Sequence, residues 1–134
     1  MTPAEQAVLA ANEAFYTAFA ERDPQAMDHL WAKRASVACI HPGWNPLRGR
    51  EPVMASWRAI FSGPGSPQIS CSRATAYVSG ESAFVICIEH VPGSLLVATN
   101  LFTREDGEWR MIHHHAGGLA EPLDDVEPPH GTVH

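Results

Sequence analysis

The residues with the clearest chemical capacity lie at the end of an alternating aromatic and aliphatic segment that finishes on three consecutive histidines. Alternation with period two places Met111, His113 and His115 on one face of a strand. His114 lies on the opposite face. Two imidazoles then border a large apolar surface, as expected at the rim of a binding pocket. The pattern predicts that His113 contacts a ligand and that His115 moves a proton, whereas His114 faces a neighbouring subunit.

Two further polar residues have positions that suit acid–base chemistry. His41 ends a short apolar segment and begins a loop rich in proline and glycine, and the pKa of an unperturbed imidazole suits a general base. The alternative interpretation is that His41 only caps a turn. Asn100 interrupts an apolar run, where a buried amide must bond a neighbouring side chain or a ligand. We therefore predict His41 as a proton acceptor and Asn100 as a donor to an oxyanion.

Metal and thiol chemistry are the weaker interpretations of the same region. A His-x-His pair on one strand face can hold one metal ion, but a third ligand would have to come from His41, His90 or Glu89, and the spacing selects none of them. Cys39 lies two residues before His41 and shares its face, which allows a nucleophilic pair. No activating signature surrounds Cys39, so a buried structural thiol is favoured. We predict neither a metal nor a cofactor.

Large apolar side chains are expected to form the core and to border any pocket. Trp44 differs from the others because it lies in a polar, turn-rich loop, where an aromatic ring commonly covers an apolar opening. We predict that Trp44 closes the site. The expected core set comprises Trp31, Trp57, Phe61, Phe84, Ile86, Phe102 and Met111. Those predicted to contact a ligand are Trp31, Trp57, Phe102 and Met111.

Start, stop and turn signals predict three helices followed by strands. Thr2-Pro3-Ala4-Glu5 is a capping box that begins the first helix, and Asp23-Pro24 begins a short second one. The first helix is predicted at 3–21, and the short second one carries Met27, Leu30 and Trp31 on its apolar side. A third helix is marked by Val53, Trp57, Ile60 and Phe61 and ends at Ser62-Gly63-Pro64-Gly65. The predicted strands are 36–40, 68–79, 82–91, 95–104 and 109–115. Helices segregated from a meander of strands indicate an α+β, cone-shaped domain, with the helices packed on a strongly curved, mostly antiparallel sheet.

Composition and charge bound the remaining possibilities. The 134 residues are 45% hydrophobic and 18% charged, with a net charge of -6, which fits one globular domain and excludes nucleic acid as a partner. The apolar runs are too short to span a bilayer. The three cysteines show no C-x-x-C spacing, so a reducing cytoplasm is the expected location. We place the domain at 1–116 and a tail rich in proline and acidic residues at 117–134.

The sheet face turned away from the helices is expected to be too apolar for water. This expectation rests on five residues assigned to that face: Val85, Cys87, Val97, Leu101 and Ile112. A homodimer formed through the sheet would cover them.

The order of these elements resembles the nuclear transport factor 2-like superfamily, whose cone-shaped fold is shared by ketosteroid isomerase and the SnoaL-like polyketide cyclases. The resemblance covers about residues 4–116 and is closest to a small SnoaL-like bacterial subfamily, many of whose members have no assigned reaction. The motifs that carry it are Asn12-Glu13-Ala14-Phe15-Tyr16, Arg22-Asp23-Pro24, Leu30-Trp31, Leu47-Arg48-Gly49-Arg50-Glu51, Trp57 and the closing segment from Trp109 to His115.

This resemblance also implies where isomerase chemistry would lie. A ketosteroid isomerase uses an aspartate base together with a tyrosine and a protonated acid. The tyrosine position falls at Phe15, the base at His41 and the second oxyanion donor at Asn100, so none of the three groups is retained. Steroid isomerisation by the usual set is therefore excluded, while histidine and asparagine leave a proton-transfer site open. Phe15 is expected to line the pocket.

The sequence thus supports two classes of function. In the first, the protein binds a small apolar or amphipathic molecule and acts without a cofactor as an isomerase, cyclase or dehydratase. In the second, it is a non-catalytic dimerisation module with a vestigial pocket, because this fold hosts association domains as well as enzymes.

Overall fold

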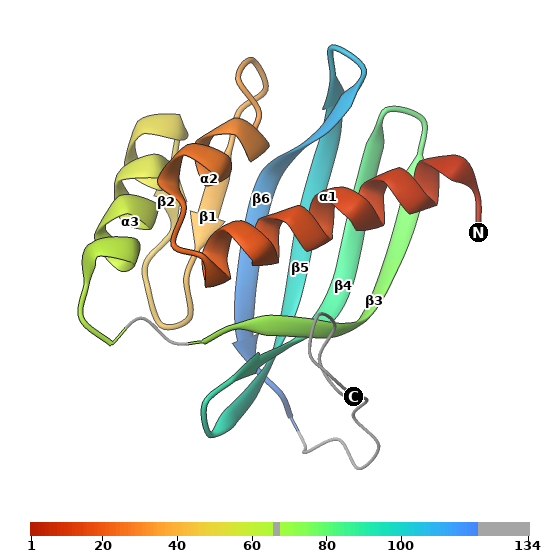
Figure 1. The fold of residues 1–134 in the computed structure, drawn as a ribbon. Coiled ribbons are helices and arrows are strands. Elements are labelled where there is room, and N and C mark those ends of the chain that lie inside the picture. The colour runs from red at the N-terminus through yellow and green to blue at the C-terminus, as the bar shows by residue number, and fades with distance from the viewer. Residues whose placement is uncertain (66–67, 121–134) are drawn as a thin grey trace.

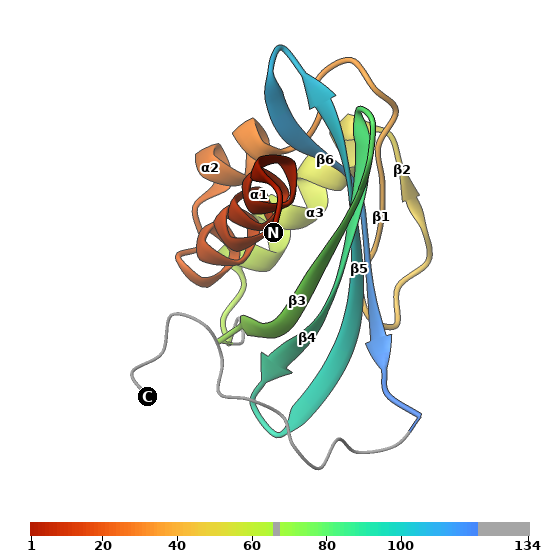
Figure 2. The same cartoon turned by 90° about the vertical axis from the view of Figure 1, so that its right-hand side faces the viewer.

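A computed structural model describes residues 1–65 and 68–120, and its three helices pack on one face of a single sheet (Figure 1, Figure 2). The helices are α1 (Pro3–Ala20), α2 (Pro24–Leu30) and α3 (Arg50–Ser62). The predicted capping box is present, because the Thr2 hydroxyl accepts the Glu5 backbone N–H and the Glu5 carboxylate accepts that of Thr2. Within the described ranges, no helix has both the length and the apolar character needed to cross a membrane.

The six strands form one sheet in the order β2-β1-β6-β5-β4-β3, and only β1 and β6 pair in parallel. The strands are β1 (Ala38–Ile40), β2 (Leu47–Arg48), β3 (Ser70–Ser79), β4 (Ser82–Val91), β5 (Ser94–Glu105) and β6 (Glu108–Gly118). The helix α1 crosses the inner face of this sheet, and α3 covers the end formed by β1 and β2 (Figure 1). The predicted α+β class is confirmed.

Two differences from the predicted boundaries concern loops and the tail. The loop after the first strand contains the short strand β2, which was not predicted. The last strand continues to Gly118, two residues beyond the domain end predicted at 116. Most of the predicted tail, residues 121–134, lies outside the described residues.

A bulge in β6 reverses the predicted orientation of the histidines. The pairing with β5 shifts between Leu101, which faces His113, and Phe102, which faces Met111, so that one extra residue is inserted in β6. A bulge resets the alternation of side chains along a strand. Met111 and His114 therefore both point to the inner face, with exposed fractions of 0% and 1%. The prediction that His113 shares a face with Met111 is wrong for this reason.

The outer face of the sheet carries exposed apolar side chains. Tyr77, Phe84 and Ile86 are 46%, 40% and 39% exposed, and the rings of Tyr77 and Phe84 stack with centroids 4.6 Å apart. The assignment of Val85 and Cys87 to this face is wrong, because both are buried on the inner face. Phe84 and Ile86, expected in the core, lie outside instead. The outer face is apolar, but in β4 its apolar side chains are Phe84 and Ile86 and not the predicted Val85 and Cys87.

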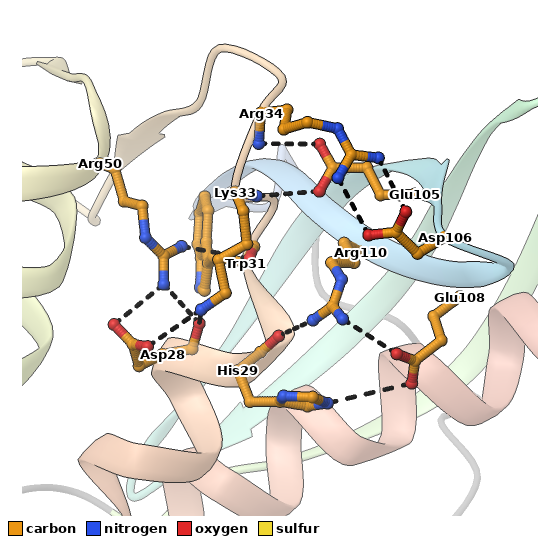
Figure 3. Close-up of polar contacts among 10 residues, drawn as sticks. All are labelled: Asp28, His29, Trp31, Lys33, Arg34, Arg50, Glu105, Asp106, Glu108 and Arg110. Atoms are coloured by element: carbon orange, nitrogen blue, oxygen red, sulfur yellow. Dashed lines mark hydrogen bonds and ion pairs between the residues drawn. The ribbon is translucent and has the colours of Figure 1, made fainter.

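A buried carboxylate joins the β5–β6 turn to the connection between α2 and β1 (Figure 3). Glu105 accepts the backbone N–H groups of Lys33, Arg34 and Ala35 at 2.9, 3.0 and 2.8 Å. The Arg34 guanidinium also pairs with Asp106. This connection leads directly into β1 and the loop that follows it, so the carboxylate fixes the segment that carries His41, Pro42 and Trp44, which line the cavity described below.

Replacing Glu105 by alanine is expected to lower the free energy of unfolding by about 2–4 kcal/mol, because three backbone donors lose their acceptor together. Glu105→Gln retains one side-chain oxygen and should lose less. Urea unfolding at neutral pH measures both changes. A loss below about 0.5 kcal/mol in Glu105→Ala, the usual range for surface substitutions, would contradict this role.

Candidate functional site

A cavity of about 510 Å³ opens between the inner face of the sheet and the helices α1 and α3. Its polar lining residues are His41, Glu89 and His114, which come from the end of β1, from β4 and from β6. The remaining lining residues are apolar, glycine or proline: Phe19, Pro42, Trp44, Ile60, Gly65, Ile69, Val91, Pro92 and Leu96. A volume of this size, with few polar groups in an apolar wall, is typical of small-molecule sites.

The hydrogen bonds around His114 determine its tautomer. The Asn100 amide nitrogen donates to the Asn12 side-chain oxygen at 2.8 Å and lies 3.2 Å from the Tyr16 hydroxyl. The other end of the amide, Oδ1, therefore faces His114 Nδ1 at 2.6 Å. An amide oxygen only accepts, so Nδ1 carries the proton. In the neutral ring, Nε2 is then left with a free lone pair.

Glu89 is a carboxyl group held almost completely out of water. It is 2% exposed, and its Oε2 accepts the Tyr16 hydroxyl at 2.7 Å. Burial raises the pKa of Glu89 to about 7, although the hydrogen bond from Tyr16 acts in the opposite direction. Burial and the nearby carboxylate together raise the pKa of Tyr16 well above its usual value, so Tyr16 remains a donor. Near neutral pH, Glu89 can hold or release a proton.

Glu89 and His114 have protonation preferences opposite to those of exposed residues. Burial, reinforced by the neighbouring histidines, lowers the pKa of His114 to about 3. The atoms His114 Nε2 and Glu89 Oε2 are 3.8 Å apart. Below pH 7 the carboxyl group is therefore the acid and the imidazole is the base. Paired groups whose pKa values are driven apart by their surroundings indicate an acid–base assignment.

The predicted residue His41 does line the cavity. Its Nε2 lies 2.9 Å from the Ser56 hydroxyl, which in turn donates to a backbone carbonyl of α3. Burial lowers the pKa of His41 to about 4, so it is neutral at physiological pH. Its ring packs edge-on against Trp44 and Trp57, each with a centroid distance of 4.7 Å. Trp44 is 46% exposed and lines the cavity.

Cys39 lies close to His41 but is not activated. The Sγ atom is 3.7 Å from His41 Nε2, and the side chain is fully buried. Burial, together with the charge of Glu89, raises the pKa of the Cys39 thiol to about 12. The thiolate that a nucleophile requires is thus disfavoured, and the geometry favours the structural interpretation.

Several predicted site residues lie elsewhere. His113 and His115 are on the outer face, so their predicted place in the pocket is wrong, and the bulge in β6 is the cause. His113 Nδ1 instead bonds the Ala38 carbonyl oxygen. Asn100 does not line the cavity but fixes His114. The aromatic and aliphatic candidates are packed in the core without lining the cavity: Phe15, Trp31, Trp57, Phe102 and Met111. Among these, Phe15 backs the His114 ring, with centroids 4.9 Å apart.

Sequence reasoning missed the residues at the centre of the cavity. His114 was assigned to an interface because strict alternation was assumed. Glu89 was considered only as a metal ligand, yet an acidic residue at the end of the strongly apolar segment 83–88 was a usable signal, since a buried acid needs a specific reason. Tyr16 was not among the predicted site residues, although it is only 3% exposed. In the part of the chain that the structure describes, no group of three potential metal ligands occurs.

The fold and the cavity together define a protein of the nuclear transport factor 2-like superfamily, as the resemblance implied. The chain belongs to the SnoaL-like family, whose domain model matches residues 8–120. It is similar to a structure from Streptomyces avermitilis described as a "putative dehydratase from the NTF2-like family". That match has 30% identity and a TM-score of 0.79, and covers 87% of this chain and 96% of the other.

Two other similar proteins have different descriptions. One is a structure from Thiobacillus denitrificans described as a "putative calcium/calmodulin-dependent protein kinase type II association domain", with 36% identity, a TM-score of 0.73 and coverage of 82% of this chain and 93% of the other. The other is the F-box protein SKIP8 of Arabidopsis thaliana, 28% identical over 124 residues, which are 91% of this chain and 53% of that protein. The chain thus spans about half the length of this curated relative.

Proposed function

We propose that the protein is a cofactor-free acid–base enzyme that dehydrates a small, mainly apolar molecule. The observation that carries this proposal is the acid–base pair in the cavity, a carboxyl group with a pKa of about 7 beside an imidazole that stays neutral. The similarity to the dehydratase-like structure favours elimination of water over isomerisation or cyclisation. The predicted proton-transfer role of His115 passes to His114, and His41 borders the mouth.

In the proposed reaction the two groups act on adjacent carbons of a β-hydroxy ketone. His114 Nε2 takes the proton from the carbon next to the carbonyl group, and the C–O bond at the β-carbon breaks. The departing hydroxyl group takes the proton of Glu89 and leaves as water. As Glu89 becomes negative, its charge 3.8 Å away stabilises the new imidazolium. Return of that proton from His114 to Glu89 restores the starting state.

This assignment fixes the direction of the pH dependence. Glu89 must be protonated and His114 neutral at the start, so kcat/KM is expected to be constant between about pH 4 and pH 7 and to fall about tenfold per pH unit above pH 7. The test uses the neutral β-hydroxy ketone formed from benzaldehyde and acetone, whose dehydration gives an absorbing enone. A rate that instead rises through pH 7 would contradict the assignment of Glu89 as the acid.

The second candidate, an association module, is supported by the outer sheet face. The apolar patch of Tyr77, Phe84 and Ile86 suits a homodimer formed through the sheet, and one similar structure is described as an association domain. Dimerisation and catalysis are compatible, because the patch and the cavity lie on opposite faces. A reducing cytoplasm remains the proposed location, since Cys39, Cys71 and Cys87 are all free thiols.

Substituting Phe84 by glutamate is expected to convert the proposed dimer to a monomer, because a carboxylate would be buried against an apolar partner surface. Light scattering on the purified protein at micromolar concentration measures the mass. The matched control is Gln6→Glu, which adds the same charge to an exposed position of α1 and should leave the dimer intact. A monomeric parent protein, or a dimeric Phe84→Glu variant, would contradict the sheet-face dimer.

A further inference from the structure

Among the residues that the structure describes, none that lines the cavity carries a positive charge that could pair with an acidic ligand. None of the residues that line it in the described ranges is lysine or arginine, and the residues outside those ranges include neither. The two histidines at the cavity are neutral, because burial lowers the pKa of His41 to about 4 and that of His114 to about 3. A carboxylate or phosphate that entered would lose its hydration without gaining a counter-charge, which costs several kcal/mol.

The polar groups of Glu89 and His114 in the cavity wall match one hydroxyl group. His114 Nε2 offers a lone pair, because the Asn100 amide oxygen holds the ring proton on Nδ1. Glu89, in its acid form, offers a proton. Their separation of 3.8 Å allows a single oxygen to lie about 2.8 Å from both, donating its own hydrogen to Nε2 and accepting the one from Glu89. A carbonyl oxygen lacks the hydrogen for His114, and an ether oxygen lacks it as well.

We propose that the cavity selects uncharged, hydroxylated ring compounds and rejects their carboxylate analogues, with the hydroxyl oxygen placed between Glu89 and His114. This inference rests on the proposed function, since the bound hydroxyl group is the one that would leave. During the reaction its hydrogen bond to His114 Nε2 breaks, which frees that lone pair for the proton of the carbon next to the carbonyl group, while the hydrogen bond from Glu89 is kept. The volume of about 510 Å³ and the wall formed by Phe19, Ile69 and Leu96 suit one or two fused rings.

The test is calorimetric binding of four naphthalene compounds with the same substitution pattern, at about pH 6, where Glu89 is protonated. They are naphthylmethanol, its methyl ether, naphthoate and naphthylmethylamine. Naphthylmethanol is expected to bind at least about 30-fold more tightly than ionised naphthoate or the ammonium ion, because both ions lose hydration on entry. The methyl ether should bind about 5–10-fold more weakly than the alcohol, since it cannot donate to His114.

A substitution in the wall makes the charge selection directly testable. Leu96 lines the cavity and is half-buried, so Leu96→Arg supplies the missing cation, whereas Leu96→Gln changes size and polarity without charge. Leu96→Arg is expected to bind naphthoate at least about tenfold more tightly than Leu96→Gln does. Circular dichroism spectra that match the parent establish that both variants are folded.

Several outcomes would overturn the proposal. With the parent protein, these outcomes are tighter binding of naphthoate or the amine than of the alcohol, equal binding of the alcohol and its methyl ether, or no binding of any of the four compounds. With Leu96→Arg, the contradicting outcome is naphthoate binding no tighter than in Leu96→Gln. Turnover is not measured in these experiments. If the protein does not dehydrate the hydroxy ketone, the binding preference for the alcohol can still hold. If the protein prefers naphthoate, the inference about the ligand is wrong, and the pH dependence of kcat/KM still tests the acid–base pair.

Discussion

Glu89→Gln is expected to reduce the dehydration rate by about 10²–10⁴-fold while making the folded protein more stable at alkaline pH. The rate falls because glutamine has the shape of the acid but cannot deliver a proton to the leaving hydroxyl group. Glutamine retains a carbonyl oxygen for the Tyr16 hydroxyl, which now bonds Glu89 at 2.7 Å. The change therefore removes the proton and the charge with little disturbance of the surrounding contacts.

The gain in stability follows from the raised pKa of Glu89, which changes from an ordinary value of 4.5 to about 7 on folding. Between these values the folded chain keeps a proton that the unfolded chain has lost, so the stabilising effect of protonation disappears as the pH rises through 7. At pH 8 the raised pKa of Glu89 therefore lowers the free energy of unfolding by an amount on the order of 3 kcal/mol. Glu89→Gln escapes this cost at pH 8, and its advantage should shrink below about 1 kcal/mol at pH 5.

Urea unfolding at pH 5 and pH 8 measures the two stabilities. The matched control is Glu81→Gln, at a carboxylate with a 72% exposed side chain, which should change the free energy of unfolding by less than about 0.5 kcal/mol. A simultaneous loss of activity and gain of stability is the combination expected where an active site holds a destabilising charge. Equal stability of Glu89→Gln and parent at pH 8 would show that Glu89 is not protonated near neutrality.

Acidification is expected to destabilise the protein below pH 6.5 through its two buried neutral histidines. Burial lowers the pKa of His41 from 6.5 to about 4 and that of His114 from 6.5 to about 3. As the pH falls, the unfolded chain binds protons that the folded chain excludes, so stability present above pH 6.5 is lost. The two histidines together lower the free energy of unfolding by about 2.7 kcal/mol for each pH unit of acidification. Between pH 6.5 and 4.5, the proton held by Glu89 in the folded chain raises it by about half of that amount.

The net expectation for the parent protein is a loss of about 1.4 kcal/mol per pH unit over this range. Glu89→Gln lacks the opposing effect and should lose about twice as much per unit. His114→Asn keeps a donor to Asn100 but cannot titrate, so its slope should fall close to zero. The control His29→Gln replaces a histidine with a 67% exposed side chain and should behave as the parent does. Urea unfolding measured across this pH range gives all four slopes, and a parent whose stability is independent of pH there would contradict the neutral assignment.

The fold was largely predictable because its signals are local. The capping box at Thr2, the Asp23-Pro24 start and the glycine turns between strands set element boundaries within a few residues of those in the structure. The short strand β2 was missed because two residues without apolar alternation carry no periodic signal. Its position depends on pairing with β1, which is a tertiary effect.

The site was only partly predictable, since it depends on one inserted residue. Alternation placed His113 inside and His114 outside, and the bulge at Ile112 exchanges the two. No local feature of that segment marks the bulge, which becomes visible only from the pairing of β6 with β5. His41 lines the cavity, and Asn100 reaches it only through its hydrogen bond with His114; the proton-acceptor role of His41 stays a prediction. The part played by Glu89 depends on its burial, which the sequence does not report.

Near neutrality, Glu89 and His114 are proposed to share one titratable proton, which lies on the carboxyl group of Glu89 and not on Nε2 of His114. A pH titration by nuclear magnetic resonance, with ¹³C-labelled glutamate and ¹⁵N-labelled histidine, tests this claim most directly, and Glu89→Gln and His114→Asn assign the two signals. The structure predicts a Glu89 carboxyl that titrates near pH 7 and a His114 ring that stays neutral, with its proton on Nδ1, down to about pH 4. A Glu89 that titrates near 4.5 beside a His114 that titrates near 6.5 would contradict the account.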